Sequence, residues 1–202
     1  MSFMYNPFPF DDPKPINRPK LSEKTINSVV TGGTPNVAKK FVAQIADKVK
    51  SEGVIVGIDG YTTANWNLFV NLLARECVIN GFEFEAVDST KAVLKSGKEI
   101  DDMIDPLLIW DTKIDPTLLY GKLYHGGYIG LFDQEKMEQF RKDVPAMKTP
   151  GKLVVVAGYG SMIAELRDLY DVKCWFDITP MKTMLRIRGG EYSNPGKEHP
   201  GI

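Results

Sequence analysis

Helix-spaced apolar positions and short apolar runs alternate along most of the chain. Residues 36–51 predict a helix because Val37, Phe41, Ile45 and Val49 recur every four residues. Residues 54–58 form a short β-branched run, which is typical of a strand buried on both faces of a sheet. The same alternation predicts strands over 82–87, 107–110, 152–157 and 172–178, and helices over 68–78, 98–104, 134–147, 162–170 and from Pro180.

Strand and helix patterns that take turns indicate a parallel sheet with right-handed crossovers and helices on both faces. We therefore expect a three-layer α/β fold over residues 36–202. Residues 1–35 differ, because five of the thirteen prolines lie between Pro7 and Pro19 among aromatic residues such as Phe8 and Phe10. Proline removes a backbone donor, so this stretch predicts an extended arm that lays its rings on the domain or on a partner. A disordered tail is the alternative.

Charge and composition exclude several classes of protein. The chain has 25 Lys and Arg against 26 Asp and Glu, and this net charge of −1 argues against a generally basic nucleic-acid binder. No run of 18 apolar residues exists, so we expect no membrane helix, and the N-terminus lacks the features of a secretory signal. Cys77 and Cys174 fit apolar patterns, which predicts free thiols in a reducing cytoplasm. With only two histidines and no Cys-x-x-Cys pair, we expect no metal site.

Candidate ligand contacts follow the first predicted strand. In an open parallel sheet, ligands bind beyond the carboxyl ends of the strands, and phosphate-binding loops occupy this strand-to-helix position. The segment 57–67 reads Gly-Ile-Asp-Gly-Tyr-Thr-Thr-Ala-Asn-Trp-Asn, and it has Trp66 near the place of the usual phosphate lysine. We therefore expect weak binding of a Mg-nucleotide and poor phosphoryl transfer. The residues predicted to line this phosphate or ligand site are Asp59, Gly60, Thr62 and Thr63.

Three short blocks resemble a known family. They are residues 118–128 with 131–133, residues 154–161, and residues 175–180 with 186–190 and Asn194. Together they resemble uridine-kinase-like domains, in particular the N-terminal domain of some bacterial phosphomannose isomerase-like proteins. The resemblance covers roughly Gly53 to Asn194 and implies a sheet of P-loop kinase type with a degenerate phosphate loop. It also implies that zinc isomerase chemistry would belong to a following cupin domain, and the loop-like ending at Ile202 fits a chain cut before one; a short natural protein is the alternative.

The resemblance suggests roles for four further residues. It implies that Asp88 is the base that meets an acceptor hydroxyl, although Asp88 and Asp59 fit helix-capping residues equally well. Arg186 and Arg188 suggest a phosphate clamp, but residues two apart on a helix point in different directions, so one clamp or a solvated pair is expected. His125, beside two glycines, is either a ligand contact or a structural histidine. Ala157 departs from the acidic residue that uridine-type kinases usually carry after this strand.

These observations support one hypothesis and two alternatives. The first is a non-catalytic or weakly active kinase-like domain, which acts as a regulatory or ligand-binding module of a mannose-6-phosphate isomerase-like protein. The second is an active nucleoside or sugar kinase that uses ATP, with Lys91, Lys122 or Arg186 in place of the missing lysine. The third is a protein-interaction module that uses the N-terminal arm. The expected partners are a small phosphorylated ligand or a nucleotide, a second copy of the chain, or an attached isomerase domain.

Overall fold

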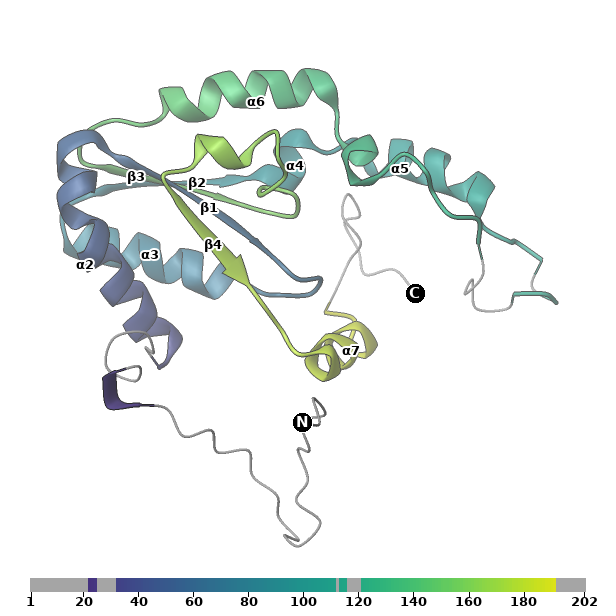
Figure 1. Cartoon of the computed structure of the whole chain (residues 1–202), viewed down its shortest axis with the longest axis horizontal. Coiled ribbons are helices and arrows are strands. Elements are labelled where there is room, and N and C mark those ends of the chain that lie inside the picture. The colour runs from purple at the N-terminus through teal and green to yellow at the C-terminus, as the bar shows by residue number, and fades with distance from the viewer. Residues whose placement is uncertain (1–21, 25–31, 112, 116–120, 192–202) are drawn as a thin grey trace, which may run out of the picture.

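A parallel sheet forms the centre of the molecule (Figure 1). The computed structural model describes residues 22–24, 32–111, 113–115 and 121–191, so most of the predicted proline-rich arm lies outside the described residues. The sheet has four strands in the order β2-β3-β1-β4, and every neighbouring pair is parallel. The α/β prediction is therefore confirmed. The strands are β1 (Val54–Gly60), β2 (Glu83–Asp88), β3 (Lys152–Ala157) and β4 (Val172–Phe176).

Helices cover both faces of this sheet and produce the three predicted layers (Figure 1). Alternate residues of a strand point to opposite faces. Accordingly, Val56 of β1 packs in the core with α2 and α3, whereas its neighbour Ile55 packs in a second core with α4 and α6. The helices are α2 (Thr34–Glu52), α3 (Asn67–Ile79), α4 (Ser89–Val93), α5 (Gly97–Ile104), α6 (Gln134–Ala146) and α7 (Pro180–Arg188). No helix among these described segments is both long and apolar enough to cross a membrane.

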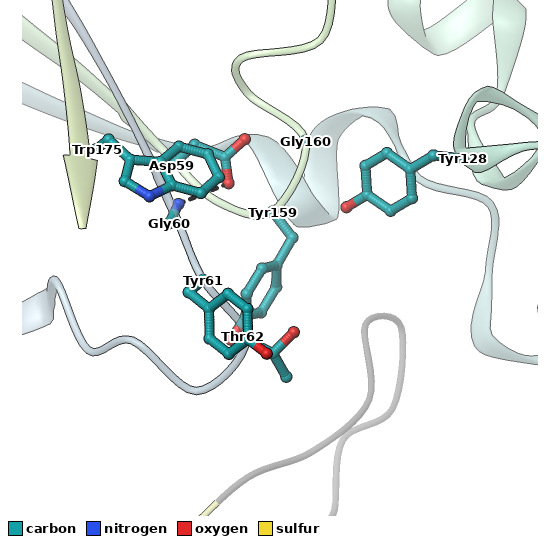
Figure 2. Close-up of a pocket in the computed structure, with 8 residues that line it drawn as sticks. All are labelled: Asp59, Gly60, Tyr61, Thr62, Tyr128, Tyr159, Gly160 and Trp175. Carbon is teal, nitrogen blue, oxygen red and sulfur yellow. Dashed lines mark hydrogen bonds between the residues drawn. The ribbon is translucent and has the colours of Figure 1, made fainter. Parts of the chain in front are cut away.

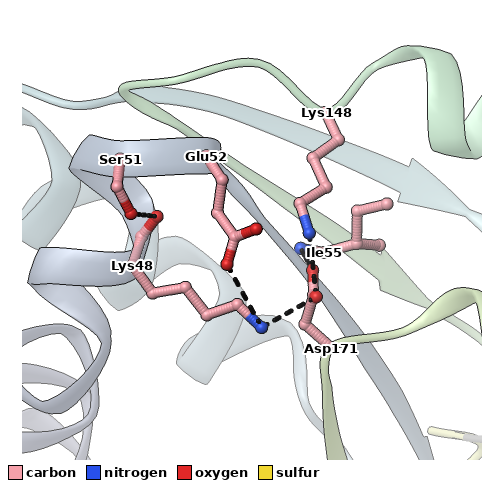
Figure 3. A network of polar contacts seen from close by, with 6 residues as sticks. All are labelled: Lys48, Ser51, Glu52, Ile55, Lys148 and Asp171. Atoms are coloured by element: carbon pink, nitrogen blue, oxygen red, sulfur yellow. Dashed lines mark hydrogen bonds and ion pairs between the residues drawn. The ribbon is translucent and has the colours of Figure 1, made fainter.

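The amino ends of β1 and β4 are joined by a polar network around Asp171 (Figure 3). One carboxylate oxygen of Asp171 accepts the backbone N–H of Ile55 at 2.8 Å, and the other lies 2.9 Å from the ammonium groups of both Lys48 and Lys148. Partial burial opposes ionisation, but this N–H and the two cations outweigh it and hold the pKa of Asp171 below its usual range. The network joins α2 and the segment just after α6 to the amino ends of the strands. The candidate site lies at the other end of the sheet, beyond the carboxyl ends of the strands.

Two predicted elements are wrong, and one short helix was not predicted. Residues 162–170 form turns and a 3-10 helix, η3 (Arg167–Leu169), instead of an α-helix, and most of their backbone bonds span three residues, as from Leu166 to Ile163 and from Leu169 to Leu166. Residues 107–110 form no strand. The 3-10 helix η1 (Asp105–Leu107) extends into the segment, and one isolated antiparallel bridge joins Leu108 to Gly121. The helix missed by the sequence analysis is α4. The helix predicted from residue 36 starts earlier, at Thr34.

Candidate functional site

A pocket of about 290 Å³ lies beyond the carboxyl ends of β1, β3 and β4 (Figure 2). Three of the predicted site residues, Asp59, Gly60 and Thr62, line it. The remaining lining residues come from the same loop after β1 (Tyr61), from the turn after β3, from the 3-10 helix η2 (Tyr128–Leu131) and from β4. The full lining is Asp59, Gly60, Tyr61, Thr62, Tyr128, Tyr159, Gly160 and Trp175.

The loop between β1 and α3 has the position of a phosphate loop, but several N–H groups in it and at its two ends donate to protein oxygens. Across residues 60–67, five backbone donors are occupied in this way. Gly60 donates to Asp59 Oδ1 at 2.8 Å and Ala64 to the carbonyl of Tyr61 at 2.8 Å. The other three bonds run from Tyr61 to the carbonyl of Phe176 (2.8 Å), from Thr63 to the hydroxyl of Tyr159 (3.3 Å) and from Asn67 to Asn65 Oδ1 (3.0 Å). A phosphate nest needs such donors to face the ligand.

Gly60 itself is required by packing. A Cβ at this position would lie 2.4 Å from the carbonyl oxygen of Phe176 and 2.9 Å from its Cβ. Glycine therefore allows the last residue of β1 to approach β4 closely, and this explains the residue without any ligand. Thr63, three residues further along the loop, is buried and has a φ of 69°, a left-handed backbone conformation that few non-glycine residues adopt.

The helix α7 is anchored on this loop. Arg186 donates from its guanidinium to the carbonyl of Thr63, and the hydroxyls of Thr63 and Thr183 lie 3.2 Å apart. Arg186 thus contacts a loop carbonyl and does not line the pocket, while Arg188 is exposed in the last turn of α7. A phosphate-clamping role for either arginine stays a prediction.

The carboxylate of Asp59 is almost fully buried at the bottom of the site. It accepts the N–H groups of Gly60 at 2.8 Å and Met162 at 3.0 Å, so it does not cap a helix. Burial raises the pKa of Asp59 above its usual value, and hydrogen bonds from the backbone of Met162, Gly60 and Gly160 act against this rise. Across the described ranges, no lysine or arginine forms an ion pair with Asp59.

Asp88 is placed as the cap of α4. Its side chain accepts the N–H of Lys91 at 3.2 Å, which satisfies one of the unpaired donors at a helix start. Asp88 pairs with Ala157 across β2 and β3, and Ala157 pairs with Ile58 across β3 and β1. Two strand spacings amount to about 10 Å, so the backbones of Asp88 and Asp59 are roughly that far apart. The capping bond neither supports nor opposes the proposed role of Asp88 as a base.

The tryptophans and His125 have different environments. Trp66 is buried in the core, with its ring centroid 5.1 Å from that of Tyr159, and it does not line the pocket. Trp175 is exposed and lines the pocket wall, whereas Trp110 is exposed elsewhere. His125 is exposed in the segment before η2 and lies outside the lining.

The aromatic character of the site was not predicted from the sequence. Tyr61 directly follows β1 and Tyr159 is the second residue after β3, so the strand-end rule that selected Asp59 could also have selected them. Tyr128 has no local signal, because only tertiary structure brings η2 to the ends of the strands.

The chain has an α/β fold with a four-stranded parallel sheet, and this fold resembles that of P-loop kinases. A protein from Silicibacter sp. TM1040, proposed to be a fructose transport system kinase, has a similar structure. The TM-score is 0.51 at 13% identity, over 78% of this chain and 80% of that chain. A possible uridine kinase from Bacillus stearothermophilus aligns with a TM-score of 0.46 at 12% identity over 74% of this chain and 84% of that chain. At such identities the similarity shows the fold alone.

A family model places the chain more narrowly. Residues 39–201 match the model of a family described as a domain of unknown function (DUF8485), and the chain belongs to that family. The comparison with curated proteins gave no match. The structural match with a TM-score of 0.51 supports the kinase-like fold that was expected from the three sequence blocks.

Proposed function

We propose that this domain binds a small ligand in the pocket beyond β1 and does not transfer phosphoryl groups. In this proposal the domain is a regulatory or ligand-binding module of a mannose-6-phosphate isomerase-like protein. The observation that carries the loss of transfer is that five N–H groups across residues 60–67, from the end of β1 to the start of α3, already donate to protein oxygens.

Two further features support a loss of phosphoryl transfer. Residues 57–67 contain no lysine, and a charge-assisted contact of this kind contributes about 1.5–3 kcal/mol. The buried carboxylate of Asp59 lines the same pocket, so a phosphate there would meet a like charge at low dielectric. Each loop donor that turned toward a phosphate would also give up a bond of about 0.5–1.5 kcal/mol to the protein.

The test is a coupled assay for ADP formation with Mg-ATP and a panel of nucleosides and sugars. The expected result is a rate equal to the enzyme-free blank. The Asp88→Ala variant is the matched control, because it removes the candidate base at an exposed position. Turnover by the wild type that disappears in Asp88→Ala would refute the proposal and establish an active kinase.

Ligand binding is tested by thermal shift with neutral, anionic and cationic small molecules. A ligand at 100 times its dissociation constant adds about 2.7 kcal/mol to the free energy of unfolding. The isomerase link rests on the resemblance of the three sequence blocks. It predicts that phosphomannose isomerase activity co-purifies with the tagged chain from its native cells, and a clean pull-down without that activity would remove this part of the proposal.

A further inference from the structure

The pocket beyond β1 is walled by aromatic side chains from four separate segments. Tyr61 follows β1, Tyr159 follows β3, Tyr128 belongs to η2, and Trp175 belongs to β4. Three of these residues are well exposed, with Tyr61 and Tyr128 at 48% and Trp175 at 63%. Exposed apolar side chains that cluster around one pocket are typical of a binding site. Figure 2 shows the hydroxyl of Tyr128 pointing toward the other lining residues.

Two of these rings are held in place by the core. The ring of Tyr159 meets Trp66 edge to face at 5.1 Å, and its hydroxyl accepts the N–H of Thr63. The ring of Tyr128 meets the buried Phe132 edge to face at 5.4 Å. Such bracing fixes part of the wall before a ligand arrives, which lowers the entropy cost of binding.

The only charged side chain in the lining is the carboxylate of Asp59. Each carboxylate oxygen of Asp59 accepts one backbone N–H, from Gly60 and from Met162, and these bonds hold the negative charge in place at the pocket. Arg186 acts electrostatically on Tyr159 but does not line the pocket, since its guanidinium faces the carbonyl of Thr63 and lies 3.8 Å from Glu191.

We infer that this pocket takes a small organic cation, an alkylammonium or quaternary ammonium group, held by the aromatic walls and the Asp59 carboxylate. This inference rests on the proposed ligand-binding function and names the ligand class. The face of an aromatic ring attracts a cation, and one such contact changes affinity about 2- to 30-fold, most when water is excluded. A pocket of about 290 Å³ lies at the small end of ligand sites, which restricts the ligand to a compact group.

The experiment compares choline with 3,3-dimethyl-1-butanol, which has the same shape without the charge. Binding of each to the full chain is measured by calorimetry and by tryptophan fluorescence at pH 7. We expect saturable binding of choline and at least about tenfold weaker binding of the neutral isostere. Trp175→Ala should weaken choline binding about 2- to 30-fold. Trp110→Ala is the matched control, because Trp110 is 59% exposed and lies outside the pocket, and it should leave binding unchanged.

The charge of the site is tested with Asp59→Asn, which keeps the side-chain shape. In this variant choline and the neutral isostere should bind with equal affinity. If Asp59→Asn does not fold, the loss of choline affinity in Trp175→Ala still tests the inference. Equal binding of choline and the isostere, or no saturation by choline, would overturn the inference. If uridine monophosphate or inorganic phosphate bound while choline did not, the cation class would fail and a non-transferring ligand site would stand. Turnover of ATP would instead refute the proposed function.

Discussion

Replacing Gly60 with alanine separates packing from ligand binding as the reason for a glycine in the loop. The added Cβ would lie 2.4 Å from the carbonyl oxygen of Phe176 and 2.9 Å from its Cβ. Neither atom is the far end of a flexible side chain, so β4 must move away from β1. That movement also strains the hydrogen bond from the N–H of Tyr61 to the same carbonyl, which is 2.8 Å long.

The size of the effect follows from three contributions. Overpacking a tight site costs about 1–3 kcal/mol, and loss of the Tyr61 hydrogen bond costs about 0.5–1.5 kcal/mol. Alanine restricts the unfolded chain more than glycine does, which returns about 0.4–1 kcal/mol. We therefore expect Gly60→Ala to lower the free energy of unfolding by about 2 kcal/mol. In a chain of this size that loss lowers the Tm by about 4–8 °C.

Urea denaturation followed by circular dichroism measures this difference. Gly32→Ala is the matched control, because a Cβ at Gly32 would meet no atom within 4 Å and should leave the midpoint unchanged. The m-value should be the same for all three proteins if only native stability changes. A Gly60→Ala protein as stable as the wild type would refute the packing explanation and would leave ligand approach as the reason for this glycine.

Three further predictions concern the rest of the domain. Asp171→Ala should cost about 1–3 kcal/mol in urea denaturation at pH 7, whereas the exposed Asp47→Ala should cost little. Because the folded-state pKa of Asp171 is depressed, its contribution is complete above the unfolded value near 4 and is lost as the pH falls through the folded value; an equal gap at pH 7 and pH 2 would contradict this. Phe132→Ala should cost about 3–5 kcal/mol, since this ring is 1% exposed, and the exposed Leu123→Ala serves as its control; similar midpoints would refute the assignment. Burial raises the pKa of Cys77 to about 11, so a thiol reagent at pH 8 should label it only as fast as the domain opens, and rapid labelling of folded protein would contradict this.

The fold was predictable wherever a pattern is local. All seven residues of β1 are buried, as its β-branched run implied, and the bounds of β3 agree with the predicted 152–157. The helix prediction for residues 162–170 was wrong because a series of turns can bury the same apolar residues, such as Leu166, that a helix would bury. The five-residue helix α4 was too short for any periodic signal.

The candidate site was predictable in position and only partly in chemistry. The strand-end rule selected Asp59, Gly60 and Thr62, which line the pocket, and Thr63, which does not. It could not reveal that Gly60 is a packing residue, because the carbonyl that requires it belongs to Phe176, 116 positions later in the chain. Nor could it reveal the aromatic wall, since Tyr128 reaches the pocket from a 3-10 helix that no sheet pattern indicates.

The most direct measurement of the central claim follows the backbone amide signals of residues 60–67 by NMR during a Mg-ATP titration. A loop whose donors are occupied by Asp59, Phe176 and Tyr159 should give no saturable shift at Gly60, Tyr61 or Thr63. Saturable downfield shifts of these amides would show that the N–H groups turn to a phosphate, and this would contradict the closed loop on which the proposed function rests.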